Sequence, residues 1–203
     1  MSNSRLPGST LALLPVTVED LPVITKLWYA SMPPFEDIWP NTAAGHAWWD
    51  AANLAELNQP NRHYLKVVDT AADNRLIAYG KWDFAVFAEE RGGPRFPPWC
   101  TDSKPEAGDK FVNSLESERK RLCGDAPSYY LDMLATHPEW ERRGAASLIM
   151  QWGCERADKA GVLAYVDAST KGKGLYTKFG FEDKTGPAAV PGIASMVRYP
   201  SPK

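Results

Sequence analysis

The sequence lacks any long run of apolar residues, and the segment before Val16 has neither the apolar core nor the small-residue cleavage site of a secretory signal. A membrane-spanning helix needs about 20 apolar residues, so no membrane partner is expected. Cysteine is scarce, with Cys100, Cys123 and Cys154 widely spaced, and none of the three histidines stands near a cysteine at metal-ligand spacing. Because disulfide frameworks need paired cysteines and zinc sites need clustered ligands, we expect reduced thiols, a cytoplasmic location and no metal.

An excess of positive charge is also missing. The chain has 23 Lys and Arg against 25 Asp and Glu, a formal net charge of −2. Nucleic-acid binding depends on basic groups that neutralise phosphates, so no nucleic-acid partner is expected. With 203 residues and 44% hydrophobic residues, the chain is long and apolar enough for an ordinary globular domain. We therefore expect a single domain over residues 1–203 and leave its oligomeric state open between monomer and homodimer.

Apolar periodicity predicts an alternation of strands and helices along the chain. Between the third and fourth strands, residues 88–126 form a long insertion that begins rich in Pro, Gly and charge and ends in a short polar helix over 111–122. The order predicts an α/β fold, a mixed sheet with helices on its faces. We expect strands at 11–16, 64–68, 76–86, 129–135 and 162–166, and the last strands begin at 181 and close with 193–199. We expect helices from 17 to before Pro33, at 42–57, at 144–160 and at 171–179.

The segment from Leu131 to Trp152, LDMLATHPEWERRGAASLIMQW, carries the strongest chemical pattern. It predicts a strand, a tight turn and a helix that starts with the small residues Gly144 and Ala145. The first amide groups of a helix lack partners, and the helix dipole makes that end positive. Small residues let a phosphate approach the backbone, so the pattern indicates a pyrophosphate site. From this segment alone, an ordinary strand–turn–helix unit remains the alternative.

Two motifs together resemble the GNAT superfamily of N-acetyltransferases. HPEWERRGAA is similar to the first motif of the family, with Gly144 and Ala146 in the small-residue positions, whereas Glu141 replaces the usual Gln or Arg. ASTKGKGLYTKFGFE is similar to the second, with Tyr176 at the matching spacing and Ser169 in place of a common Asn. The close resemblance covers about residues 129–182. It implies a mixed, mostly antiparallel central sheet with helices on both faces and acetyl-CoA as co-substrate.

The resemblance also implies direct transfer of an acetyl group from the thioester to a primary amine in a ternary complex. Tyr176 is predicted to protonate the leaving thiolate, because the resemblance places this residue beside the thioester sulfur. Asp132 is predicted to be the general base, since a carboxylate in an apolar strand must be paired or used. Alternation along this strand puts Tyr130, Asp132 and Leu134 on one face. A packed ring, a structural carboxylate or a water chain is the alternative for these roles.

The cofactor is expected to lie along the predicted strand, the helix start and the second motif. In the family, a splay between the strands at 129–135 and 162–166 admits the pantetheine arm, which pairs with backbone groups. The predicted cofactor-binding residues are Leu134, Ala135, Thr136, Arg142, Arg143, Gly144, Ala145, Ala146, Ser147, Ser169 and Tyr176.

The acceptor side is expected among the first helices, which are rich in aromatic residues. Trp28, Phe35 and Tyr130 are predicted to contact the acceptor, whereas Trp48 and Trp82 fit core packing better. The insertion at 88–126 is either a lid or a spacer. The leading function is acetyl transfer to a small-molecule amine. The alternatives are a protein or peptide N-acetyltransferase and a degenerate acetyl-CoA-binding sensor without catalysis.

Overall fold

The computed structural model describes residues 9–32, 35, 37–84 and 96–201. Its centre is a seven-stranded sheet in the order β1-β2-β3-β4-β5-β7-β6. All neighbouring strands are antiparallel except β4 and β5, which are parallel. The strands are β1 (Leu11–Pro15), β2 (Arg62–Asp69), β3 (Arg75–Asp83), β4 (Ser128–Thr136), β5 (Leu163–Ser169), β6 (Glu182–Asp183) and β7 (Ile193–Arg198).

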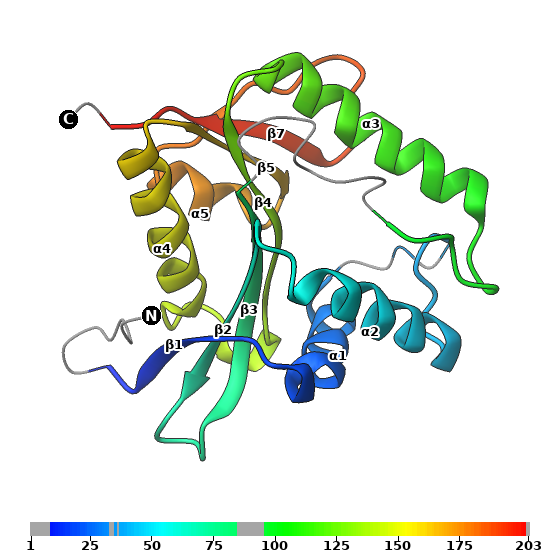
Figure 1. Ribbon diagram of the computed structural model, residues 1–203, viewed down its shortest axis with the longest axis vertical. Coiled ribbons are helices and arrows are strands. Elements are labelled where there is room, and N and C mark those ends of the chain that lie inside the picture. Colours follow the sequence, from blue (N-terminus) through cyan, green and yellow to red (C-terminus); the bar gives the residue numbers. More distant parts are fainter. Residues whose placement is uncertain (1–8, 33–34, 36, 85–95, 202–203) are drawn as a thin grey trace.

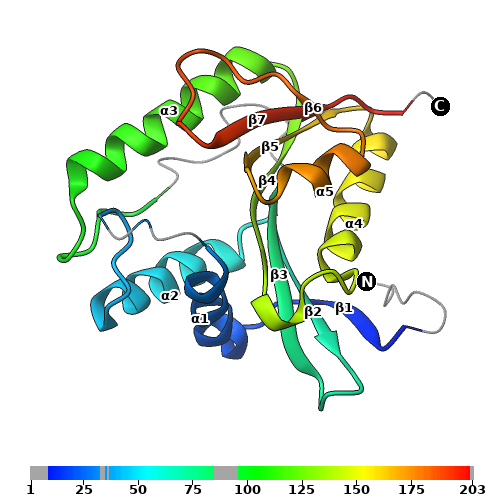
Figure 2. The same cartoon turned by 180° about the vertical axis from the view of Figure 1, so that it is seen from behind.

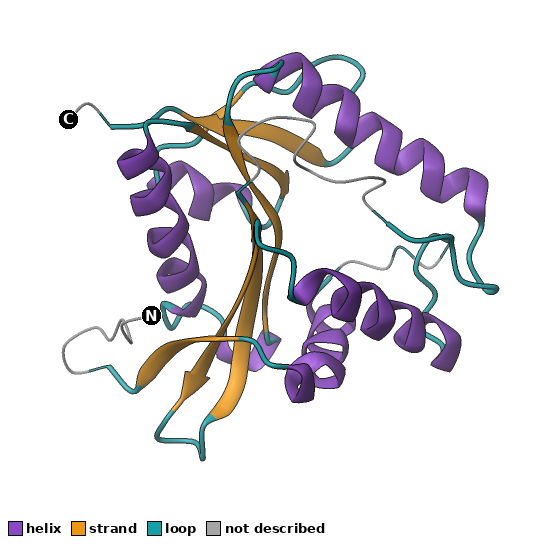
Figure 3. Cartoon of the chain, viewed as in Figure 1, coloured by secondary structure: helices purple, strands orange, loops and turns teal. Residues whose placement is uncertain are grey.

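Helices cover both faces of this sheet (Figures 1 and 3). One face carries α4 and α5, and the other carries α1, α2 and α3, as the view from behind also shows (Figure 2). The predicted mixed, mostly antiparallel sheet with helices on both faces is therefore confirmed. None of the helices in the described ranges is long and apolar enough to cross a membrane. The helices are α1 (Leu21–Ser31), α2 (Ala43–Leu57), α3 (Pro105–Cys123), α4 (Ala145–Ala160) and α5 (Lys173–Lys178).

Local sequence signals explain where most elements begin and end. Thr42 caps α2, because its hydroxyl oxygen accepts a hydrogen bond from the Gly45 amide at 3.1 Å. The turn between β2 and β3 holds Asp73 and Asn74 at φ values of 52° and 54°, in the left-handed region that Asn and Asp tolerate best after glycine. Gly161 ends α4 at φ 70°. The predicted boundaries of these elements are confirmed to within a few residues.

The core lies on both sides of the central strands. Between the sheet and α4, Trp82 is fully buried and donates its indole N–H to the Ile149 carbonyl at 3.2 Å. A Cβ on Gly153 would lie 2.1 Å from the Trp82 ring, so α4 packs closely only because this position is glycine. On the other side, Ile24 and Tyr79 belong to an apolar cluster between the sheet and the first two helices. The prediction that Trp82 packs in the core is confirmed.

The stretch between β3 and β4 differs from its prediction. The helix expected at 111–122 is the longer α3, with 19 residues from Pro105 to Cys123. Pro105 occupies the first turn, where a missing amide hydrogen costs no helical bond. The Trp99 ring covers Gly108 so closely that a Cβ at that position would lie 2.5 Å from the ring. Residues 88–95 of the predicted insertion lie outside the described residues, and the insertion stays a prediction.

One extra residue in β4 changes which side chains share a face. Lys81 of β3 pairs with Met133, but the next residue, Trp82, pairs with Leu131, so the register shifts by one residue at Asp132, in a β-bulge. After the bulge, Met133 packs in the cluster under α1, whereas Leu134 packs in the cluster under α4. The prediction that Leu134 shares a face with Tyr130 and Asp132 is wrong, because simple alternation does not survive a bulge.

Candidate active site

The parallel strands β4 and β5 part where the site begins. Their pairing runs only from Ser128 with Leu163 to Leu131 with Val166, although β4 continues to Thr136 and β5 to Ser169. Beyond Leu131, β4 still pairs with β3 along its other edge. The splay that the family resemblance implies is therefore present. It leaves one edge of the β4 backbone facing the gap, where a pantetheine arm could pair with it.

A cavity of about 110 Å³ opens at this splay. Its wall includes Asp132 and Leu134 of β4, Ser169 of β5 and Tyr176 of α5. Trp28 and Phe35 line the same cavity from the α1 side. Ala135 instead lies in the core under α1. The structure thus brings both predicted catalytic residues together with predicted cofactor and acceptor residues.

The start of α4 lies at the turn after β4. Gly144 has φ 90°, a left-handed conformation that glycine adopts without strain, and no atom lies within 4 Å of where its Cβ would stand. The first helical hydrogen bond runs from the Leu148 amide to the Gly144 carbonyl at 3.2 Å. Among the described residues, none accepts a hydrogen bond from the amide groups of 142–147. This open row of donors at a helix N-terminus fits a diphosphate.

Two side chains near this turn already have partners. Glu141, which departs from the family motif, forms an ion pair with Lys171 at 2.6 Å and thereby joins the two motif segments. The Arg143 guanidinium lies over the Trp140 ring, 4.5 Å from its centroid. The predicted phosphate contact of Arg143 therefore competes with stacking on Trp140.

Tyr176 is buried beside the splay, with 7% of its surface exposed. Its ring packs edge-on against Phe181 at a centroid distance of 6.0 Å, and a Cβ on Gly172 would come within 3.1 Å of it. Burial raises the pKa of Tyr176 above its ordinary value, and the negative charge of Asp167 acts in the same direction. The hydroxyl group therefore stays protonated near neutral pH and has a proton to give.

Asp132 is both buried and paired. Its carboxylate lies 2.5 Å from the Lys81 ammonium, and each side chain is only 3% exposed. Lys81 also binds Glu56 at 2.6 Å. Asp132 lines the splay cavity and a second, larger cavity beside it. The carboxylate that the sequence pattern singles out thus has a structural partner on one side and open space on the other.

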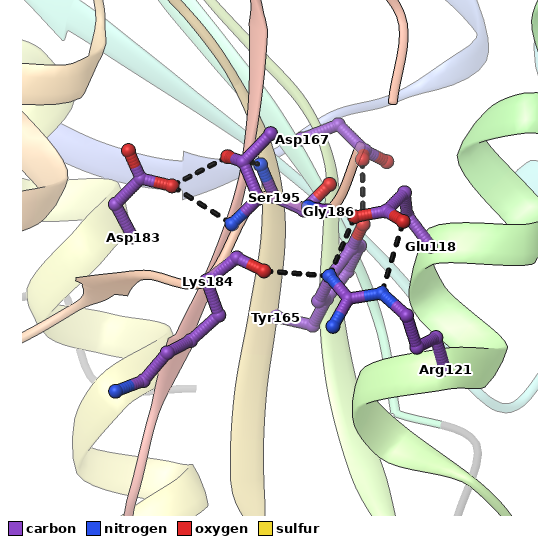
Figure 4. A network of polar contacts seen from close by, with 9 residues as sticks. Glu118, Arg121, Tyr165, Asp167, Asp183, Lys184, Gly186 and Ser195 are labelled. Carbon is purple, nitrogen blue, oxygen red and sulfur yellow. Dashed lines mark hydrogen bonds and ion pairs between the residues drawn. The ribbon is translucent and has the colours of Figure 1, made fainter. Parts of the chain in front are cut away.

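A second carboxylate at the splay is missing from the sequence-based prediction. Asp167 of β5 lines the same cavity as Tyr176 and accepts hydrogen bonds from the hydroxyl groups of Tyr130 (2.8 Å) and Tyr165 (2.7 Å). The signal that points to Asp132, a carboxylate within an apolar strand, applies equally to Asp167. Figure 4 shows the contact with Tyr165, together with the Glu118–Arg121 pair of α3 that binds the loop after β6.

The larger cavity has a volume of about 500 Å³ and lies on the α3 side of the sheet. Its polar wall includes the Arg62–Asp83 ion pair, and the Arg119 guanidinium lies 4.7 Å from the centroid of the Tyr130 ring. Carboxylates outnumber guanidinium groups along the wall, which favours a cationic ligand. The cavity is lined by Arg62, Asp83, Phe96, Pro97, Pro98, Trp99, Asp109, Val112, Asn113, Glu116, Arg119, Tyr130 and Asp132.

The three predicted acceptor residues are divided between the two cavities. Tyr130 lines the larger cavity, and Trp28 and Phe35 line the smaller one. Trp28 is also packed, at 4.8 Å from Trp49 between ring centroids, so lining and core packing are combined in one side chain. Within the described ranges, no group of three or more His, Cys, Asp or Glu side chains is arranged to hold a metal ion.

Comparison with known proteins gives the same picture. Residues 111–183 match the family model described as "Acetyltransferase (GNAT) domain". No curated protein matches the sequence significantly. Among solved structures, an arylalkylamine N-acetyltransferase 2 from Aedes aegypti is similar with a TM-score of 0.64 at 11% identity, covering 93% of this chain and 98% of that one.

Two further structures are similar over nearly their whole length. A PaiA N-acetyltransferase from Thermoplasma acidophilum, in complex with coenzyme A, has a TM-score of 0.56 at 12% identity and covers 93% of this chain and 98% of its own. A spermidine N-acetyltransferase chimera from Vibrio cholerae and human sequences has a TM-score of 0.57 at 14% identity, with 94% and 96% covered. At these identities the structures show a shared fold. Residues 111–183, which match the GNAT acetyltransferase domain, lie within this shared fold.

Proposed function

We propose that the protein is an acetyl-CoA-dependent N-acetyltransferase that acetylates the primary amine of a small molecule. The observation that carries this proposal is the splay cavity, where Tyr176, Ser169 and Leu134 meet Asp132. The amide groups at the start of α4 fit the diphosphate of coenzyme A, and the edge of β4 beyond its pairing with β5 fits its pantetheine arm. The acetyl group would then lie between the two predicted catalytic side chains.

The acceptor is proposed to enter through the larger cavity. Asp132 lines both cavities and therefore lies where an amine and a thioester would meet. A cavity of about 500 Å³ suits a small molecule. Its excess of carboxylates favours an ammonium ion, and the rings of Phe96 and Trp99 add apolar contact and cation–π attraction. The amine substrates named for two structural relatives, spermidine and arylalkylamines, have the same chemistry.

The reaction then needs one proton acceptor and one proton donor. Asp132 takes a proton from the amine, and the nitrogen forms a bond to the thioester carbonyl carbon. As the carbon–sulfur bond breaks, Tyr176 gives its proton to the leaving sulfur. The products are an acetamide and a free thiol, and the proton held by Asp132 passes through water to Tyr176, which restores both side chains. No covalent bond to the protein is formed at any step.

Thiol release measured with acetyl-CoA and a panel of primary amines tests this function. Turnover of at least one amine is expected, with kcat lowered at least tenfold in Asp132→Asn. The matched control is Asp20→Asn, a carboxylate that also pairs with a lysine at 2.5 Å but lines neither cavity. Tight binding of acetyl-CoA without turnover of any amine or peptide would favour the sensor, and turnover of peptides alone would favour a protein acetyltransferase.

A further inference from the structure

Lys81 is a buried lysine to which no sequence motif points. It lies in β3 with 2% of its surface exposed. Its ammonium binds Asp132 at 2.5 Å and Glu56 at 2.6 Å. Glu56 in turn accepts a hydrogen bond from the Tyr64 hydroxyl group at 2.9 Å, and the same hydroxyl contacts Asn53 at 3.1 Å. The Lys81 ammonium is thus held by α2 and β2 on one side and presented to Asp132 on the other.

The energetics of burial show why this arrangement is unusual. A buried ammonium costs several kcal/mol unless opposite charges compensate for the lost water. Burial alone would lower the pKa of Lys81, but Asp132, together with Tyr64 and Glu56, outweighs burial and raises it. Lys81 is therefore positively charged throughout the physiological range. One cation shared by two carboxylates leaves one unit of negative charge beside the cavities.

We propose that Lys81, fixed by Glu56, is a positioning residue that keeps the Asp132 carboxylate ionised and turned toward the junction of the two cavities. This inference rests on the proposed function, because it assigns a role to the base of that reaction. An ammonium this close favours the charged carboxylate. Glu56 opposes that effect, because it draws part of the ammonium charge to itself. Asp132 is thereby ionised, and yet its charge is less fully neutralised than in a simple pair.

The neighbouring elements add further charges that act on this group. β2 and β3 contribute the Arg62–Asp83 ion pair. The Arg119–Glu116 pair of α3 lines the larger cavity together with Asp132. Asp167 of β5 lines the splay cavity with Asp132. The charged and titratable groups around Asp132 and along the two cavities it lines are Glu56, Arg62, Tyr64, Tyr79, Lys81, Asp83, Asp109, Glu116, Arg119, Tyr130, Asp167 and Tyr176.

Two substitutions should move the pH profile in opposite directions. In Lys81→Met the Asp132 carboxylate loses its neighbouring cation and keeps its proton to higher pH. The acidic limb of the pH profile of kcat should therefore move up by about one pH unit or more. In Glu56→Gln the Lys81 ammonium pairs with Asp132 alone, so the acidic limb should move to lower pH. Below the limb, each unit of movement equals about a tenfold change in rate. Lys66→Met is the matched control, because it breaks the Lys66–Asp20 pair and should leave the limb in place.

A second readout does not depend on turnover. Carbon-13 labelling of aspartate side chains, with Asp132→Asn for assignment, follows the ionisation of Asp132 directly by NMR. The same opposite displacements are expected there, and acetyl-CoA affinity should stay within about threefold. Displacement of both variants in one direction, or none in either, would overturn the role of Lys81. If no amine is acetylated, the proposed function fails while this titration still decides the inference. If Lys81→Met does not fold, Glu56→Gln alone carries the test.

Discussion

On the α4 side of the sheet the candidate site consists of main-chain groups, whereas on the α1 and α3 side it consists of charged and aromatic side chains. The α4 side offers the amides of residues 142–147, for which the described part of the chain supplies no acceptor, and the edge of β4 beyond its pairing with β5. The other side offers ion pairs such as Lys81–Asp132 and rings such as Trp99. A cofactor common to a family can be held by backbone geometry, but an individual acceptor needs particular side chains. Substitutions should therefore separate cofactor effects from acceptor effects.

The largest effect is expected at Tyr176, where the two sides meet. Tyr176→Phe removes the proposed proton donor and keeps the ring, so kcat should decrease by about 10² or more. Acetyl-CoA affinity, measured by calorimetry, should change little because the ring still packs on Phe181. Tyr199→Phe, at an exposed tyrosine, is the control. Full activity of Tyr176→Phe would show that Tyr176 is not the proton donor.

The α4 side can be tested with two matched glycines. Gly144 and Gly161 flank α4, both have positive φ, and no atom lies within 4 Å of either Cβ position. Alanine at either site should cost about 1–2 kcal/mol of folding stability. Only Gly144→Ala should also weaken coenzyme A binding, by about tenfold, because it shifts the amides that we propose bind the diphosphate. If calorimetry gives the two variants equal affinities for coenzyme A, the turn at Gly144 does not bind the cofactor.

A smaller effect is expected from Tyr130 on the acceptor side. Tyr130→Phe removes the hydroxyl group that donates to Asp167 at 2.8 Å. The wall of the larger cavity should loosen, and the KM of the amine should rise by about three- to tenfold. The KM of acetyl-CoA should stay constant. If only the KM of acetyl-CoA changed, Tyr130 would belong to the cofactor side of the site and not to the acceptor side.

The last and smallest expected effect is a difference in alkylation between the Cys154 and Cys100 thiols. Burial raises the pKa of the Cys154 thiol to about 11, which outweighs the opposing charge of Arg198. At pH 8 about one thiol in 10³ is then ionised, so iodoacetamide should leave Cys154 in α4 intact. Cys100, partly exposed near the larger cavity, should react. Mass spectrometry of the native and the denatured protein gives the comparison, and rapid native alkylation of Cys154 would contradict it.

Most of the fold and the cofactor side can be predicted because their signals are local. The cap at Thr42, the turn at Asp73 and the start of α4 at Gly144 each depend on residues a few positions apart. The helix predicted at 111–122 is shorter than α3, because the first turn of α3 is polar and contains Gly108, which the Trp99 ring covers in three dimensions. Only Pro105 signals the earlier start.

The acceptor side resists prediction because its contacts join distant elements. Nothing in the sequence around Lys81 shows that it will meet Asp132 and Glu56 from two other elements. The bulge at Asp132 leaves no trace in the apolar pattern, so simple alternation places Leu134 on the wrong face. Asp167 carries the same signal as Asp132, and its tyrosine partners become visible only in the folded sheet.

The extra residue in β4 also determines how this protein can change. Removal of Asp132 would restore regular alternation and leave Met133 and the residues after it opposite their present partners on β3. Leu134 would stay in the core beneath α4. A one-residue deletion would therefore remove the carboxylate and the bulge together while both core layers keep their faces, whereas substitution removes the carboxylate alone. The core on either side of the sheet thus places no demand on the residue at this position.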